Sequence, residues 1–260
     1  MNKTTKVSTV KTSKLNEAWG KAMESADLDI LKNIRKKGKV EIMAAKLKEV
    51  ANREPRLLVK FDSKKQLPEI FKQENLGILP ISRKGYVVSR VELFQDLPKK
   101  PEDITYVPVP KNIETVDFRK ITSEPGVVAA AKASGMLNDF FKESQLVDGL
   151  SGRKASGVFD FKISGQDVHV DNAQMVIDAT LESNDSIYLV EVKTAKYKDY
   201  CVRQSYYPYR HFVDSCRKKV VPCLLLYDKG LFRLLEYEFK DKNNYSSFNL
   251  VREKDYKIQF

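Results

Sequence analysis

Two apolar segments joined by a short polar stretch constrain the fold of this chain more than any other feature. Residues 174–181 and 187–193 are mostly apolar, and residues 183–186 between them are all polar. A turn signal between two apolar runs predicts an antiparallel pair of strands. If the turn is symmetric about the centre of the polar stretch, Asp178 and Glu191 are equally far from that centre and lie directly opposite each other.

The charged side chains on these strands suggest a metal-dependent reaction. Directly opposed strand residues have Cβ atoms about 5 Å apart, and two like charges at that distance repel unless a cation lies between them. Asp178 and Glu191 therefore predict a divalent cation, and two carboxylates with the Val192 carbonyl and waters suit Mg²⁺. Lys193 shares the face of Glu191 and is expected to orient or deprotonate a water, or to neutralise charge on a phosphate. The alternative is a structural salt-bridge cluster of the same charged residues.

The motif Asp178…Glu191-Val192-Lys193 on paired strands, preceded by a helix and followed by a helix and a strand, resembles the PD-(D/E)XK nuclease superfamily. The resemblance covers residues 53–260 and narrows to a group of type II restriction endonucleases. It rests on the segments EPRLLVKFDS, LPEIF, ILPISR, SEPGVVAAAKASGMLNDF, SGR and RQSYYPYRHF.

The resemblance implies a restriction-endonuclease-like core and Mg²⁺-dependent cleavage of double-stranded DNA at a short specific sequence. The three charged residues of the motif would then bind the metal and act on the attacking water. The chain departs from the group at Val176, where an acidic residue is expected, so a second metal site does not follow. Glu143 and Glu182 are alternative sources of another carboxylate. Cutting both strands implies a homodimer, and protection of the host implies a cognate DNA methyltransferase.

The expected order of elements is that of an α/β fold with a mixed sheet flanked by helices. Hydrophobic spacing and turn residues define the elements, with a break near Asp27 and an extended stretch at 53–62. The expected helices cover residues 15–37, 43–51, 64–74, 127–143 and 200–215. The expected strands cover residues 39–42, 78–81, 86–94, 158–163, 168–181, 187–193, 220–227 and 231–239. The first helices and strand resemble a small winged-helix or helix-turn-helix module.

Positive charge is concentrated near the N-terminus. Residues 1–60 contain 15 Lys and Arg against 7 Asp and Glu, whereas the other 200 residues contain 31 against 28. A basic region on a near-neutral body indicates a nucleic-acid partner, and the alternative is a solvated arm that only aids solubility. We therefore expect a disordered basic arm at 1–14, a DNA-recognition region at 15–110 and a catalytic domain at 111–260.

Nine polar side chains outside the motif are candidates for DNA contact, because such groups hold phosphates and fix the register of bound DNA. Gln174 shares the strand face of Asp178 if the strand is unbroken, and Arg153 follows Gly152 in an expected loop. The other candidates are Arg203, Gln204, Tyr207 and Arg210 on the last helix and Lys36, Lys37 and Lys39 near the N-terminus. The alternatives are a turn for the loop, a packing face for the helix and a solvated turn for the lysines.

The sequence lacks the signatures of several classes of protein. No window approaches ~18 consecutive apolar residues, the length of a membrane span, and the polar N-terminus is not a secretory signal. We therefore expect a cytoplasmic protein with no membrane partner. None of the 11 glycines lies in a GxxxxGK[ST] phosphate loop, which argues against a nucleotide-driven motor. The remaining alternatives are a non-enzymatic DNA-binding protein on a nuclease-like scaffold and a repair-type nuclease of the same superfamily.

Overall fold

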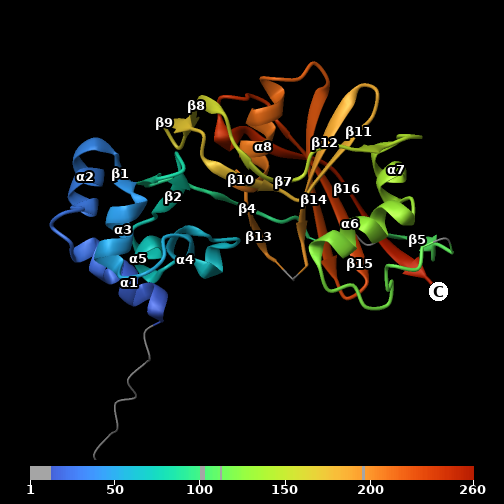
Figure 1. Cartoon of the computed structure of the whole chain (residues 1–260), viewed down its shortest axis with the longest axis horizontal. Coiled ribbons are helices and arrows are strands. Elements are labelled where there is room, and N and C mark those ends of the chain that lie inside the picture. The colour runs from blue at the N-terminus through green and yellow to red at the C-terminus, as the bar shows by residue number, and fades with distance from the viewer. Residues whose placement is uncertain (1–12, 100–102, 112, 195–196) are drawn as a thin grey trace, which may run out of the picture.

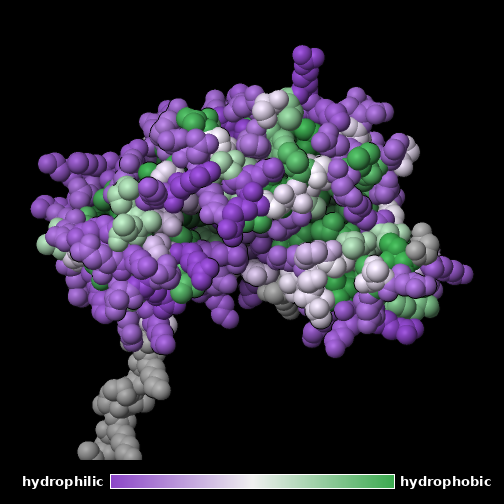
Figure 2. All heavy atoms as spheres, viewed as in Figure 1, coloured by the Kyte–Doolittle hydropathy of each residue, from purple (hydrophilic) through white to green (hydrophobic). Residues whose placement is uncertain are grey.

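The computed structural model of the chain describes residues 13–99, 103–111, 113–194 and 197–260. Most of the basic arm expected at residues 1–14 lies outside the described residues. Figure 1 shows a helical N-terminal part at one end of the molecule and a strand-rich C-terminal part at the other. Figure 2 shows that most of the same face is hydrophilic, and that the hydrophobic residues visible on it gather mainly over the C-terminal part.

The N-terminal part combines short helices with a small antiparallel sheet. Its helices are α1 (Lys14–Glu24), α2 (Ile30–Lys37), α3 (Ala44–Ala51), α4 (Arg56–Val59), the 3-10 helix η1 (Lys64–Gln66) and α5 (Glu69–Gln73). Its strands, in spatial order, are β1 (Lys39–Met43), β3 (Gly85–Ser89) and β2 (Gly77–Pro80). The break expected near Asp27 is confirmed, because the chain leaves the helix between α1 and α2.

Local sequence explains the ends of the first two helices. The Ser13 hydroxyl caps α1 by accepting the Asn16 N–H at 3.2 Å. Gly38 ends α2 at φ 79°, a left-handed conformation that glycine adopts without steric cost. Trp19 on α1 is fully buried, and its indole N–H donates to the Leu58 carbonyl at 3.0 Å. This bond ties α1 to α4.

Seven strands form a mixed sheet in the C-terminal part. Their spatial order is β5-β16-β15-β14-β12-β11-β6. The bounds are β5 (Ile104–Pro108), β6 (Val147–Asp148), β11 (Ala179–Glu182), β12 (Ser186–Lys193), β14 (Lys219–Asp228), β15 (Leu231–Phe239) and β16 (Phe248–Gln259). The pairs β12–β14 and β5–β16 are parallel, and the other neighbours are antiparallel.

Helices cover both faces of this sheet (Figure 1). They are α6 (Glu124–Ala133), α7 (Met136–Phe141) and α8 (Arg203–Val213). Alternation along β12 divides the core, since Val190 and Val192 pack with α6 and α7 whereas Ile187 and Leu189 pack with α8. The structure thus confirms a mixed α/β fold with a large mixed sheet flanked by helices. Among the described residues, no helix is long and apolar enough to cross a bilayer.

Three two-stranded pairs complete the fold. They are β7 (Gly152–Ala155) with β10 (Gln174–Ile177), β8 (Val158–Ile163) with β9 (Gln166–Asp171), and β4 (Phe94–Asp96) with β13 (Asp199–Cys201). A second 3-10 helix, η2 (Tyr245–Ser247), precedes β16. The β4–β13 pair brings the N-terminal half of the chain beside the segment that leads into α8.

Several expected elements are interrupted. The strand expected at 168–181 is three strands, β9, β10 and β11, because the chain turns at Asn172 with φ 53° and bends at Asp178. The helix expected at 127–143 divides into α6 and α7 at Gly135, whose φ is 71°. Likewise, the helix expected at 64–74 is η1 followed by α5, and the strand expected at 86–94 is divided between β3 and β4.

Four stretches were assigned wrongly or left without an element. The segment expected to be extended at 53–62 contains α4, where Pro55 at φ −55° is preset for a helix start. Residues 104–108 and 248–259 form strands of the large sheet that the pattern did not predict. Gly152 and Arg153 lie on strand β7 and not in a loop. The domain boundaries at residues 14 and 110 stay predictions.

Candidate functional site

The strand pair that carries the motif has the register expected from the sequence. In β11 and β12, Ala179 pairs with Val190 and Glu182 with Ile187. Asp178 lies at the bend one residue before β11, at the position that this register sets opposite Glu191. Its Oδ2 accepts the backbone N–H of Val192 at 2.8 Å. The backbone of β12 therefore fixes the direction of the Asp178 carboxylate.

Glu191 and Lys193 project from the same face of β12, as expected, and form a buried ion pair. Each is only 7% exposed, and the Lys193 ammonium donates to Glu191 Oε1 at 2.5 Å. Burying a charged pair costs desolvation free energy that the attraction of the two charges only partly restores. The structure therefore keeps two charges inside the sheet where apolar residues would pack at lower cost.

Burial and neighbouring charges shift the pKa of both partners in this ion pair. Burial raises the pKa of Glu191 to about 7, with the neighbouring charge of Asp178 acting in the same direction and Lys193 opposing it. The pKa of Lys193 is also raised: burial acts to lower it, but the charge of Glu191, the hydrogen bond to Glu191 and the charges of Asp62 and Asp178 together outweigh that effect. Lys193 is thus an ammonium at neutral pH, whereas Glu191 is poised between its neutral and ionised forms.

Gln204, at the start of α8, joins the site to the N-terminal part. Its amide nitrogen donates to Glu191 Oε1 at 2.7 Å and lies 3.3 Å from Asp62 Oδ1. Its carbonyl oxygen is buried and has no hydrogen-bond partner in the described chain. Asp178, Glu191, Gln204 and Pro208 are among the residues that line a cavity of about 10 Å³. That volume is about the least that can hold one water molecule.

The sequence reasoning missed Glu124, which starts α6. The pKa of Glu124 is raised, first by burial and then by the charge of Asp178, while Lys193 and Lys60 act in the opposite direction. Asp62 also raises it. The interaction places Glu124 and Asp62 near the motif, although both are distant from it in sequence. The only local signal was the helix start at Ser123, whose hydroxyl accepts the Gly126 N–H at 3.2 Å as expected for a cap.

The donor chemistry of these carboxylates fits a hard divalent cation. Glu124, Asp178 and Glu191 supply oxygen atoms, the ligands that Mg²⁺ prefers. The charge of Asp178 raises the pKa of both other carboxyl groups, and a cation between them would relieve that repulsion. No group of three or more His, Cys, Asp or Glu side chains in metal-binding geometry is found in the described part of the chain.

The structure brings Arg153 and Gln174 together beside the motif. They lie on β7 and β10, which pair so that Val176 is opposite Arg153 and Gln174 is opposite Ala155. Arg153, Gln174 and Val176 are all exposed. The bend at Asp178 separates β10 from β11, so Gln174 and Asp178 do not lie on one continuous strand.

The other helix candidates are mostly enclosed by the protein. Tyr207 is fully buried and its hydroxyl donates to the Pro80 carbonyl at 2.8 Å. Arg210 is buried and donates to the Asp160 carbonyl at 2.9 Å and to Asp214 at 3.0 Å. The Tyr207 hydroxyl and the terminal nitrogens of Arg210 donate within the fold, which favours the packing alternative for both. Arg203 stacks over the Tyr207 ring at 5.8 Å.

The three N-terminal lysines lie apart from the motif, in the N-terminal part of the fold. Lys36 and Lys37 are exposed in the last turn of α2. Lys39 opens β1, and its ammonium donates to the Asp167 carbonyl at 2.6 Å. These positions leave Lys36 and Lys37 accessible to a polyanion, while Lys39 already contacts β9.

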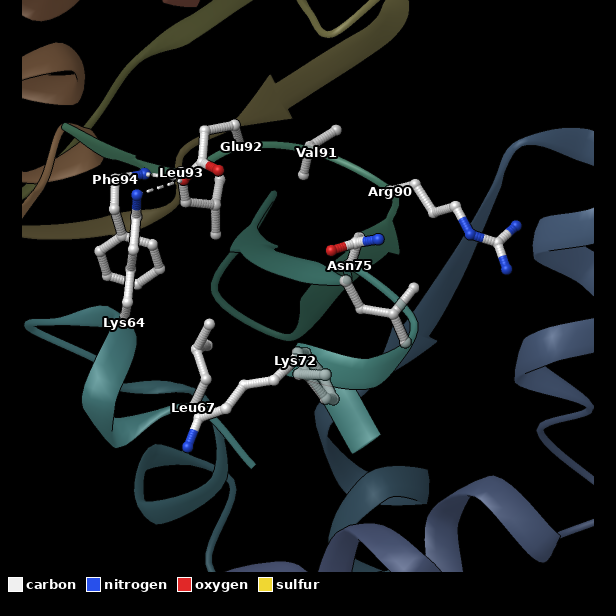
Figure 3. Close-up of a pocket in the computed structure, with 11 residues that line it drawn as sticks. Lys64, Leu67, Lys72, Asn75, Arg90, Val91, Glu92, Leu93 and Phe94 are labelled. Carbon is white, nitrogen blue, oxygen red and sulfur yellow. Dashed lines mark hydrogen bonds and ion pairs between the residues drawn. The ribbon is translucent and has the colours of Figure 1, made fainter. Parts of the chain in front are cut away.

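A larger pocket of about 420 Å³ lies in the N-terminal part (Figure 3). Its cations are paired to acids, since Lys64 lies 3.1 Å from Asp96 and Arg90 lies 2.6 Å from Glu74. In Figure 3, Arg90 extends away from the pocket and Lys64 points toward Glu92. None of the motif residues lines it, so volume alone does not identify the site of chemistry.

Two family models match the chain. The model described as Domain of unknown function (DUF6996) matches residues 16–88, and the model described as Domain of unknown function (DUF6997) matches residues 89–257. No curated protein and no solved structure matches the chain. These descriptions name no activity, so the side chains around Glu191 are the main indication of what the chain does.

Proposed function

Because the chain belongs to the family described as Domain of unknown function (DUF6997), whose description names no activity, we propose its function from its own site. The chain is a type II restriction endonuclease of the PD-(D/E)XK superfamily, which hydrolyses double-stranded DNA at a short specific sequence with Mg²⁺. The large mixed sheet flanked by helices is its restriction-endonuclease-like core.

One observation carries this proposal: three charged groups converge at the end of one strand pair. Asp178 is held by the Val192 amide, and Glu191 and Lys193 are buried together two residues apart. A purely structural cluster has no need for a third charge that raises the pKa of one partner. A site that binds a cation and a phosphate requires both carboxylates and the ammonium.

The reaction is hydrolysis of a phosphodiester. The oxygen of a water bonds to phosphorus and the bond from phosphorus to O3′ breaks, which leaves a 5′-phosphate and a 3′-hydroxyl. Mg²⁺, when bound, would polarise the phosphate and lower the pKa of the attacking water. Asp178 and Glu191 would hold it, with Glu124 and the Val192 carbonyl as further oxygen donors.

The raised pKa of Lys193 favours one of the roles open to it. An ammonium that stays protonated at neutral pH cannot take a proton from water. Lys193 instead places positive charge where the phosphate gains negative charge in the transition state. Gln204 holds the Glu191 carboxylate in place through the 2.7 Å hydrogen bond.

The N-terminal part supports DNA binding in this proposal. Its helices alternate with three antiparallel strands whose spatial order is β1-β3-β2, and this arrangement supports the resemblance to a winged-helix module. Most of the surplus positive charge of the chain falls within residues 1–60, and such charge binds the DNA backbone with a strong dependence on salt. We also propose a cytoplasmic homodimer paired with a DNA methyltransferase of the same specificity. Light scattering of the DNA complex tests the dimer.

Plasmid digestion with Mg²⁺ tests the proposed function. Wild type is compared with Asp178→Asn, Lys193→Gln and a control, Lys162→Ala, which removes an exposed lysine from β8. We expect fixed fragments from wild type and the control and none from the two site variants, with circular dichroism confirming that all four are folded. Equal cleavage by all four would refute the site.

Other outcomes separate the alternatives. A smear in place of fixed fragments would indicate a repair-type nuclease. DNA binding that weakens steeply with salt, without any cleavage, would indicate a non-enzymatic DNA-binding protein.

A further inference from the structure

The β7–β10 pair, called here the ribbon, presents one solvated face beside the motif. Opposed residues on antiparallel strands point to the same side, so Arg153 and Val176 share a face, and Gln174 and Ala155 extend it. The chain passes from Ile177, the last ribbon residue of β10, directly to Asp178. Any duplex with its scissile phosphate at Asp178 therefore lies close to the ribbon.

The inner face of the ribbon is anchored to the protein core. Met175 and Ile177 are buried, and β10 packs against α8 and β12. A two-stranded ribbon alone is marginally stable in water, but this one is supported through the buried inner side of β10. Its outer side chains are thus held by a rigid backing, which recognition of a fixed geometry requires.

The outer face carries polar groups that have no partner among the residues that the structure describes. Arg153 and Gln174 are exposed, and neither side chain has a hydrogen bond or ion pair within the described chain. Val176 is 53% exposed, so its apolar side chain is accessible on the same face. By contrast, Lys154 points to the other side, since it is paired with the buried Met175.

The chemistry of this face matches the edges of base pairs. An arginine fork pairs with the two acceptors of guanine, a glutamine amide pairs with adenine, and an apolar side chain contacts the thymine methyl group. The major groove of B-DNA is about 12 Å wide and admits a two-stranded ribbon. Four residues at about 3.4 Å each span a similar length.

We propose that the outer face of the ribbon, formed by Arg153, Gln174 and Val176, enters the major groove and reads base edges next to the cut phosphate. The inference rests on the proposed function for its DNA substrate, and it assigns part of the sequence specificity to the catalytic part of the chain. Arg153 then recognises a base, and its charge is not used mainly for the phosphate backbone.

Selection of bound sequences from a randomised duplex library tests this assignment. All proteins carry Asp178→Asn so that the DNA stays intact, and Arg153→Ala, Arg153→Lys and the control Lys154→Ala are compared with that parent. We expect one enriched motif for the parent and for the control. Both Arg153 variants should lose discrimination at one position by about ten-fold or more, because a lysine lacks the two-pronged donor.

Three results would overturn the inference. The first is an unchanged motif in both Arg153 variants. The second is uniform weakening with Arg153→Ala, a salt slope reduced by about one and rescue by lysine, which would mark a phosphate contact. The third is a parent that enriches no motif. Plasmid cleavage by the chain with Asp178 intact is scored separately, so cutting with an unchanged motif removes the ribbon assignment and leaves the proposed function standing.

Discussion

The side chains of Gln204 and Glu191 are joined by a hydrogen bond of 2.7 Å from the Gln204 amide to Glu191 Oε1. The same amide lies 3.3 Å from Asp62 Oδ1, so one side chain on α8 contacts both the strand pair and the N-terminal part. A second hydrogen bond joins the two parts of the fold: the Lys64 backbone N–H donates to Asp199 Oδ1 at 2.7 Å. The N-terminal part of the fold is thus connected directly to the candidate site.

Replacing Gln204 should lower cleavage without greatly weakening DNA binding. Gln204→Met keeps the length of the side chain but removes the donor that holds Glu191. Loss of a group that orients a metal ligand typically costs 10- to 100-fold in affinity or activity, so we expect kcat to fall by about that factor with a smaller change in KM. Steady-state cleavage of a short duplex measures both constants. An unchanged kcat would show that Glu191 is held without Gln204.

The raised pKa of Glu191 predicts how stability depends on pH. Its folded pKa of about 7 lies above the ordinary value of 4.5 for a glutamate, so the folded state binds more protons than the unfolded state between these values. The free energy of unfolding should therefore fall as pH rises through this window, by on the order of 3 kcal/mol from this group. Urea unfolding at pH 5 and 7 in EDTA measures the fall. Glu191→Gln should reduce it, and an equal fall in the variant would disprove the attribution.

Divalent cations should stabilise the protein more at higher pH. A cation competes with the proton on Glu191, so its apparent affinity rises as pH passes through about 7. We expect the increase in Tm caused by Mg²⁺ to be larger at pH 8 than at pH 6, and to disappear in Asp178→Asn. Thermal unfolding with Mg²⁺ and after chelation compares the four conditions. A pH-independent increase in Tm would place the cation elsewhere.

Helix α4 offers a matched pair for testing the N-terminal core. Leu58 is fully buried, and its carbonyl accepts the Trp19 indole N–H, whereas the adjacent Leu57 is 52% exposed. Leu58→Ala should lower the free energy of unfolding by about 2–5 kcal/mol, the usual cost of truncating a buried leucine. Leu57→Ala should change it by less than about 0.5 kcal/mol. Urea unfolding of the two variants tests the difference, and similar values for both would contradict this packing.

The strand pair of the motif could be predicted from sequence because residues that are close together in the chain determine it. The period of two along 187–193 and the polar turn before it fix the register, and the register fixes which side chains meet. Glu124 and Asp62 could not be predicted this way, since only the packing of α6 and of the N-terminal part brings them near Asp178. The long strand β16 was missed because it is rich in charged residues and only partly buried.

For the candidate residues on α8, burial in the structure distinguishes packing from DNA contact, which the sequence could not. Arginine and tyrosine on α8 fit either DNA contact or packing, and nothing in the spacing of Tyr207 and Arg210 distinguishes the two. The structure encloses both in the core. The opposite holds for Arg153, which was expected in a loop and instead lies on a strand with its side chain exposed.

Sequencing the ends of DNA digested by this chain in Mg²⁺ is the decisive test of whether the motif residues hydrolyse phosphodiesters. We expect wild type to produce ends at one fixed position within one short sequence, each with a 5′-phosphate and a 3′-hydroxyl. We expect Asp178→Asn to produce none. Intact DNA with wild type, or identical ends with the variant, would contradict the assignment of Asp178, Glu191 and Lys193 to phosphodiester hydrolysis.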